Sequence, residues 1–167
     1  MSDIPPNPLR VLALVQQLQD RFGPQEFGQI MQILVALSFK RAGFQVVKNT
    51  IGVPDLQVFR DEGPTGFAIE VKTGESTISL SKRDLEGVMS KGGTPAVAMY
   101  FLSDPTPRWW LADARSLKAT TYRRYDIISK PALDAGFDLS DQFSRVLAEK
   151  FSIAMEGPGP LARLLSD

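Results

Sequence analysis

Apolar residues recur at helical spacing through the first quarter of the chain. Residues 9–22 predict a helix with Asn7 as its cap and Pro8 at its first position, where a proline is tolerated. Residues 25–42 predict a second helix, which Gly43 ends. Apolar residues extend beyond one face of this second helix, so we expect it to be well buried. The residues at helical spacing are Leu9, Leu12, Val15, Leu18 and Phe22 in the first helix and Phe27, Ile30, Met31, Leu34 and Leu37 in the second.

The pattern then changes to short apolar runs that are typical of strands. Residues 44–49 predict one strand, and residues 53–60 and 66–72 predict a hairpin around the turn residues 61–64. A helix over 81–91, with Ser81 as its cap, follows this hairpin.

The second half of the chain predicts two more strands and a long helix. Residues 96–102 predict a buried strand, residues 108–112 another, and residues 139–154 a helix. The tail after residue 155 opens with turn residues and ends in a short apolar run, which makes it a candidate docking segment. The order of elements predicts a mixed α/β domain, with helices flanking a central sheet of about five strands.

The length of 167 residues and the apolar content of 43% favour a single soluble domain over 1–167. We expect its core over about 25–112, an N-terminal helix within 1–24 and a helical C-terminal extension over 113–167. No apolar run approaches the roughly 18 residues needed to span a bilayer. The N-terminus does not have the pattern of a signal peptide, so we expect no membrane contact and a cytoplasmic location.

The chain contains neither cysteine nor histidine. This absence excludes disulfides, thiolate and imidazole zinc sites, and hydrolases that use a cysteine nucleophile or a histidine base. Any hydrolytic chemistry must therefore rest on carboxylates, lysine and a hard metal ion.

The formal net charge is zero, from 19 basic and 19 acidic residues, whereas nucleic-acid-binding domains are often basic. Basic side chains do concentrate between residues 115 and 130. This stretch either holds phosphates or forms a solvated surface. The basic residues in it are Arg115, Lys118, Arg123, Arg124 and Lys130.

The predicted hairpin brings charged side chains together. A four-residue turn at 61–64 puts Asp55 directly opposite Glu70, and residues paired in this way have Cβ atoms about 4.5–5.5 Å apart. Lys72 lies two residues after Glu70 and so points to the same face of the sheet. The alternating apolar residues of that strand point to the opposite face and are expected in the core. They are Phe67, Ile69 and Val71.

Two adjacent carboxylates repel each other unless one is protonated or a cation lies between them. Their oxygens suit Mg²⁺, and a neighbouring lysine can orient water or stabilise charge on a phosphate. Taken alone, a Glu-x-Lys pair on one strand is most often a solvated sheet face. The longer string VPDLQVFRDEGPTGFAIEVKTG favours a site, because its Pro-Asp, hairpin and Glu-x-Lys occur in register.

The order helix, Gly-Phe, strand, Pro-Asp, hairpin, Glu-x-Lys, helix, strand resembles the PD-(D/E)XK nuclease superfamily. Within it, the segment IEVKTGESTISLSKRDLEGVMSKGGTPAVAMYFLSDPTPRWWLA is similar to archaeal-type Holliday junction resolvases, and the resemblance covers about residues 27–112. It implies a restriction-endonuclease-like fold and a Mg²⁺- or Mn²⁺-dependent DNA endonuclease that acts on branched DNA as a homodimer.

The resemblance also implies roles for particular residues. Asp55 and Glu70 would be metal ligands, with the main-chain carbonyl of Val71 as a further ligand, and Lys72 would be the catalytic lysine. The basic residues that open the next helix would lie near the DNA backbone. They are Lys82 and Arg83.

One departure from the resolvase pattern keeps alternatives open. Such enzymes usually carry an acidic residue on the first core helix, where this chain has Gln29 and Gln32. The protein is therefore either an active nuclease, including a restriction or repair nuclease on the same fold, or an inactive nuclease-like module that binds DNA or a protein.

Two further motifs have structural interpretations. Trp109 and Trp110 are consecutive in a predicted strand, so one is expected to face the core and the other to face outward; core packing is favoured over base stacking. Gly92-Gly93 lacks the lysine and hydroxyl residue of a phosphate-binding loop, so it predicts a turn.

Overall fold

The computed structural model describes residues 6–48, 55–60 and 66–166, and it opens with two helices. In α1 (Pro8–Arg21) the Asn7 side chain accepts a hydrogen bond from the Leu9 amide at 2.8 Å, which confirms the expected cap. In α2 (Pro24–Arg41) ten residues are buried, as its apolar pattern predicts. Gly43, with φ 97°, reverses the chain after α2, and this left-handed conformation favours glycine.

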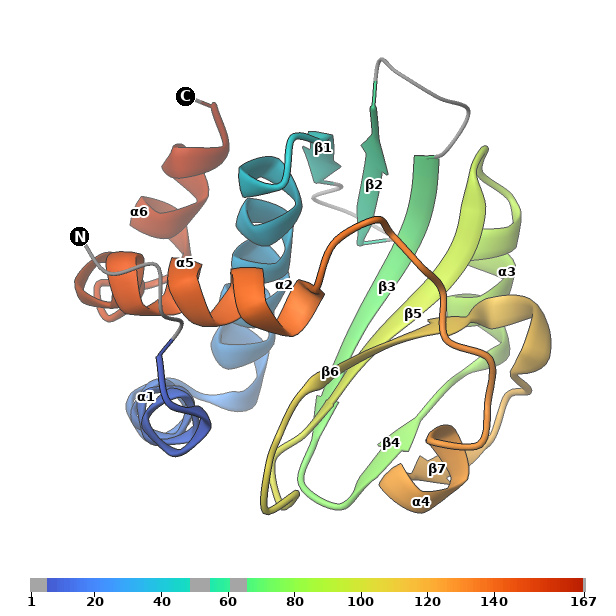
Figure 1. Ribbon diagram of the computed structural model, residues 1–167, viewed down its shortest axis with the longest axis horizontal. Coiled ribbons are helices and arrows are strands. Elements are labelled where there is room, and N and C mark those ends of the chain that lie inside the picture. The colour runs from blue at the N-terminus through green and yellow to red at the C-terminus, as the bar shows by residue number, and fades with distance from the viewer. Residues whose placement is uncertain (1–5, 49–54, 61–65, 167) are drawn as a thin grey trace.

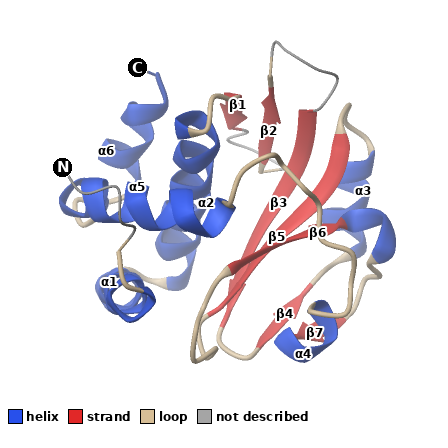
Figure 2. Ribbon diagram, in the orientation of Figure 1, coloured by secondary structure: helices blue, strands red, loops and turns tan. Residues whose placement is uncertain are grey.

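Five strands form a central mixed sheet in the order β1-β2-β3-β5-β6, and the expected α/β architecture is thereby confirmed (Figure 2). β3 and β5 are parallel, whereas every other neighbouring pair is antiparallel. The strands are β1 (Gln45–Lys48), β2 (Leu56–Phe59), β3 (Gly66–Gly74), β5 (Thr94–Phe101) and β6 (Trp109–Asp113).

The register of the β2–β3 hairpin is the one that the sequence predicts. Leu56 pairs with Ile69 and Phe59 with Gly66, and the same register places Asp55 opposite Glu70. The Pro-Asp proline and the turn at 61–64 lie outside the described residues. The pairing nevertheless fixes which side chains of β3 share a face with Glu70.

Between β3 and β5 the chain forms α3 (Lys82–Met89), with Ser81 as the expected cap. The Ser81 hydroxyl accepts from the Asp84 amide at 3.0 Å, and the Asp84 carboxylate accepts from the Ser81 amide at 2.9 Å. This reciprocal pair satisfies two backbone donors and fixes where the helix begins.

A small second sheet was not expected from the sequence. β4 (Thr77–Ser79) pairs with β7 (Thr121–Arg123), and Ile78 and Tyr122 lie buried beneath it. The region after residue 112 is therefore not wholly helical: η1 (Ala114–Ser116) and β7 precede α4 (Arg124–Ile127). The expectation of a helical extension is wrong here, because β7 completes a ribbon with a strand more than forty residues earlier.

The remaining helices form one layer with the N-terminal pair. α5 (Leu139–Ala154) and α6 (Pro158–Ala162) pack on α2, and the final turn η2 (Arg163–Ser166) follows. α1, α2, α5 and α6 gather on one side of the sheet, whereas α3 covers the other (Figure 1). The tail docks on this same chain, since the Lys40 ammonium donates to the carbonyls of Leu164 and Leu165 at 3.2 Å. Within the described ranges, no helix combines the length and apolarity needed to cross a membrane.

Candidate active site

The central strand β3 directs large apolar side chains to one side of the sheet and charged side chains to the other. Phe67, Ile69 and Val71 join the main core together with residues of α2. The intervening residues point toward α3, and Glu70 among them is only 4% exposed. A carboxyl group is thus buried in the sheet on the side that α3 covers.

Asp55 meets Glu70 immediately before β2 begins. Its backbone amide donates to Oε1 of Glu70 at 3.2 Å, and its Oδ2 accepts from the Val71 amide at 2.9 Å. The two carboxyl groups are therefore fixed beside each other by main-chain hydrogen bonds on both strands. The structure brings together the three residues predicted as ligands. The group of Val71 that contacts Asp55 is its backbone amide, and a role for its carbonyl as a metal ligand stays a prediction.

Lys72 completes the predicted set. Its ammonium group lies 3.9 Å from Oε2 of Glu70 and 3.2 Å from Oδ2 of Asp84, with 30% of the side chain exposed. The site therefore has one cation in contact with both a buried carboxyl group and solvent.

The electrostatics of Glu70 are unusual for a glutamate. Burial, together with the hydrogen bond and charge of Asp55 and the hydrogen bond of Asp84, raises the pKa of Glu70 to about 10, and the charge of Lys72 opposes this only in part. Without a cation, Glu70 keeps its proton at neutral pH. A cation that displaces this proton would relieve the crowding of the carboxyl groups.

Asp84 is a site residue that our reading of the sequence missed. It comes from α3, is 9% exposed and contacts Lys72 directly. Burial works against its ionised form, but hydrogen bonds from Glu70 and the Ser81 amide, together with the charge of Lys72, lower the pKa of Asp84. The spacing Ser81-x-x-Asp84 is a capping pattern that can be recognised from sequence, and it would have placed Asp84 in the first turn of the helix, although not against Lys72.

The glutamines of the first core helix lie in the helical layer on the side of the sheet opposite to α3. Gln29 and Gln32 are half-buried on α2, whose buried residues pack against the face of β3 that carries Ile69. The additional acidic residue beside Glu70 comes from α3 instead. The absence of an acidic residue at these two positions therefore does not leave Glu70 without acidic neighbours.

Lys82 and Arg83 lie exposed in the first turn of α3, directly before Asp84. The Lys82 ammonium group is 3.9 Å from Glu86, a weak surface pair that leaves the cation accessible. Both cations thus lie next to Asp84, the residue that contacts Lys72. Their contact with DNA stays a prediction.

The donor set fits a hard divalent cation. Asp55 and Glu70 offer carboxylate oxygens, and Mg²⁺ commonly takes only one or two carboxylates and keeps several waters. In the part of the chain that the structure describes, no three or more acidic side chains form a ready-made metal cluster. Two carboxylates with water are therefore the donor set to be tested.

All three arginines of the basic stretch are paired within the protein. Three ion pairs of 2.5–3.5 Å bind their guanidinium groups to nearby carboxylates, which favours a neutralised surface over a phosphate-binding one. The pairs are Arg115–Asp113, Arg123–Asp126 and Arg124–Asp104.

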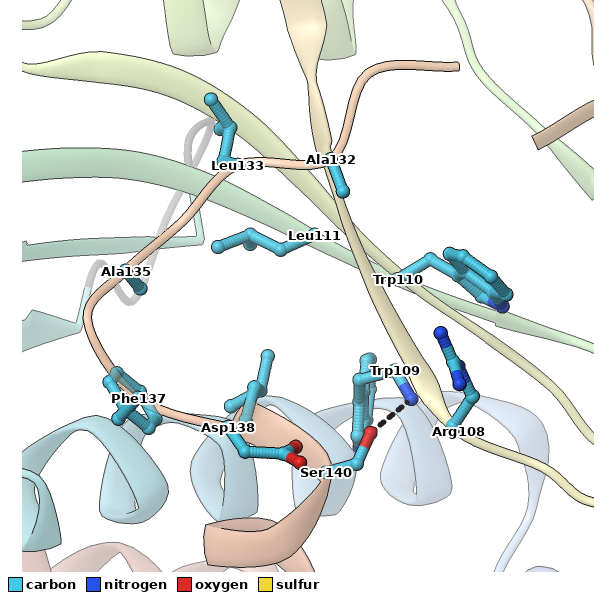
Figure 3. A pocket seen from close by; sticks show the side chains of 11 residues that line it. Arg108, Trp109, Trp110, Leu111, Ala132, Leu133, Ala135, Phe137, Asp138 and Ser140 are labelled. Carbon is cyan, nitrogen blue, oxygen red and sulfur yellow. Dashed lines mark hydrogen bonds between the residues drawn. The ribbon is translucent and has the colours of Figure 1, made fainter. Parts of the chain in front are cut away.

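The two tryptophans have structural surroundings away from the carboxylates. Trp109 is buried and its amide donates to the Ser140 hydroxyl at 2.8 Å, while the Arg108 guanidinium covers the Trp110 ring at 4.4 Å (Figure 3). Both line a cavity of about 300 Å³ between β6 and the start of α5, which Asp55, Glu70 and Lys72 do not line. Trp109 belongs to the main core, and Trp110 lies half-buried against the second core on the opposite side of the sheet. The alternation is therefore confirmed, but the expected outward orientation of one tryptophan is wrong.

Comparisons with known proteins identify no family. No protein-family model matches the chain, and a search of the curated proteins finds no match. Among solved structures, the chain is similar to Hjc, a Holliday junction resolvase from the archaeal hyperthermophile Archaeoglobus fulgidus, at 20% identity and a TM-score of 0.47. The likeness covers 59% of this chain and 92% of the resolvase. Similarity at this level does not assign a function, so the functional case has to come from the side chains of the site.

Proposed function

We propose that this protein is a divalent-metal-dependent DNA endonuclease with Asp55, Glu70 and Lys72 as its catalytic residues. The observation that carries the proposal is the pairing of Asp55 with the buried Glu70, held by two main-chain hydrogen bonds, with the Lys72 ammonium group 3.9 Å away. A buried glutamate paired with a half-buried aspartate beside a lysine has no evident use in a solvated sheet face, but it suits metal-assisted phosphodiester hydrolysis.

Asp55 and Glu70 would hold Mg²⁺ or Mn²⁺ through their carboxylate oxygens, and the Val71 carbonyl would be a further donor. The bound cation supplies Lewis acidity at the scissile phosphate and makes water more acidic. Glu70 would release its proton to solvent on binding the cation. Lys72, which is partly exposed, donates a hydrogen bond to a phosphate oxygen and stabilises the negative charge that develops there.

For the substrate, we propose branched DNA cut by a homodimer. Two symmetric sites would cut two strands of a junction, as the resemblance to archaeal-type resolvases implies. Lys82 and Arg83, exposed on α3 next to the site, would hold the DNA backbone. Because net charge is zero, binding must come from such local cations rather than from the charge of the whole surface.

The second candidate is an inactive nuclease-like module that binds DNA or a protein. It is favoured by the zero net charge and by the absence, within the described residues, of a cluster of three acidic ligands. A restriction or repair nuclease with the same residues is a variant of the first proposal.

Metal binding separates these candidates. Isothermal titration with Mn²⁺ should give one site per chain in the wild type, and Asp55→Ala should weaken that binding at least about tenfold because one of two carboxylate ligands is lost. Asp20→Asn, an exposed aspartate on α1, is the matched control and should bind as the wild type does. Undetectable Mn²⁺ binding in the wild type would favour the inactive module.

A further inference from the structure

The closest charged partner of Lys72 is a residue of α3 rather than the predicted ligand Glu70. The ammonium group lies 3.2 Å from Oδ2 of Asp84 but 3.9 Å from Oε2 of Glu70. A lysine has four rotatable bonds and a strongly hydrated head group, and 30% of this side chain is exposed. Without a fixed partner, the Lys72 head group would sample positions directed to solvent.

Asp84 is itself fixed in place. Its carboxylate accepts from the Ser81 amide at 2.9 Å, and its own amide donates to the Ser81 hydroxyl at 3.0 Å. The residue is 9% exposed and lies in the first turn of α3, which contacts β3 and β5. It therefore offers Lys72 an anchor whose position is set by the backbone of α3.

We propose that Asp84 is the positioning residue for Lys72 and holds its ammonium group beside Glu70 in the orientation that phosphodiester cleavage requires. This inference rests on the proposed nuclease function and deepens it.

Helix capping alone does not account for an aspartate at this position. The cap needs only an acceptor for the Ser81 amide, which the oxygen of an asparagine would supply equally well. A negative charge next to the Asp55–Glu70 pair is unfavourable by itself, because like charges repel. Lys72 is the cation that compensates this charge, so the charge of Asp84 and the position of Lys72 depend on each other.

A role as a metal ligand is the competing explanation. The Ser81 amide and the Lys72 ammonium group both contact the same carboxylate oxygen of Asp84, Oδ2. The positioning role predicts that Asp84 affects the rate of cleavage but not the affinity for the cation.

The test compares Asp84→Asn with Ser81→Ala in the full-length protein. Asp84→Asn keeps the size and the acceptor oxygen but removes the charge, whereas Ser81→Ala weakens the cap from the other side and leaves the Asp84 carboxylate. We expect Asp84→Asn to slow single-turnover cleavage of a DNA junction about 10–100-fold, with unchanged DNA affinity in Ca²⁺ and unchanged Mn²⁺ affinity. Ser81→Ala should lose some thermal stability and cleave at close to the wild-type rate.

Three results would overturn the proposal: an unchanged cleavage rate in Asp84→Asn, an equal loss of rate in Ser81→Ala, or a loss of Mn²⁺ affinity in Asp84→Asn like that in Asp55→Ala. The second readout is the ¹⁵N-edited NMR signal of the Lys72 ammonium group, which does not need catalysis. It should be sharp in the wild type and in Ser81→Ala and broaden in Asp84→Asn.

The two readouts separate the two claims. If the wild type cuts no DNA, the proposed function fails, and the role of Asp84 in cleavage fails with it, even where the ammonium signal shows the contact. If the wild type cuts DNA but neither rate nor signal depends on Asp84, only the positioning role fails.

Discussion

Glu70 lies in surroundings that disfavour its ionised form, although the proposed function needs that form to bind a cation. It is buried beside Asp55 and Asp84, so its ionised form, which a cation would need, is unfavourable while no cation is bound. The arrangement that we propose for metal binding therefore weakens the metal-free fold.

This conflict predicts a pH-dependent effect of Glu70→Gln. Between the ordinary pKa near 4.5 and about 10, the unfolded chain has lost the Glu70 proton while the folded chain keeps it, so stability falls as pH rises through this window. Glutamine cannot ionise, so the variant should be more stable than the wild type at pH 8, by on the order of 1–2 kcal/mol. At pH 4 the two proteins should differ little, because glutamate is then protonated in the folded chain and mostly protonated in the unfolded chain.

Urea denaturation in EDTA at both pH values measures this difference. The exposed Glu156→Gln serves as the control and should show no gain that depends on pH in this way. A Glu70→Gln protein that is less stable than the wild type at pH 8 would show that the buried carboxyl group is ionised and stabilising.

At the scale of elements, the turn between α3 and β5 sets the parallel pairing on which the site depends. Gly93 has φ 99°, and a Cβ atom there would lie 2.8 Å from the backbone of Gly66. Its neighbour Gly92 has open space around it. The turn thus brings β5 against the start of β3, where Thr94 pairs with Phe67.

The two glycines form a matched pair of substitutions. Gly93→Ala should destabilise the protein by about 1–3 kcal/mol, from the left-handed backbone and the clash with Gly66. Gly92→Ala should change stability by less than about 0.5 kcal/mol. Urea midpoints of the two variants check this, and equal values would mean that the turn does not constrain the sheet as described.

The hairpin and the capped helices could be predicted from sequence because their signals are local. Side chains alternate strictly along a strand, so a turn at 61–64 fixes the Asp55–Glu70 register, and Ser81 marks the start of α3. β4 and β7 could not be found in this way, because three residues are too few to show alternation and their pairing joins distant segments. Asp84 was missed for a related reason: its contact with Lys72 depends on how α3 packs on the sheet.

Across the whole molecule, the two sides of the sheet have different tasks. The layer of α1, α2, α5 and α6 buries the larger core, and residues of α5 such as Phe143 and Leu147 belong to that core rather than to an appendage. The other side carries the candidate site under α3, and Lys82 and Arg83 are exposed in the first turn of that helix. This division allows the candidate site to be polar without placing polar groups in the main core. The expected homodimer and the cytoplasmic location stay predictions.

The central claim is that Asp55, Glu70 and Lys72 cut DNA, and cleavage tests it most directly. Labelled four-way-junction and linear duplex DNA of matched sequence should be incubated with purified protein in Mg²⁺ and in Mn²⁺, beside Lys72→Ala and the exposed-lysine control Lys91→Ala. We expect metal-dependent paired cuts in the junction by the wild type and the control, and a loss of at least about 100-fold in Lys72→Ala. Equal cutting of both DNAs would keep the nuclease but replace the proposed substrate. DNA that remains uncut in both metals, or that Lys72→Ala cuts at the wild-type rate, would contradict the account.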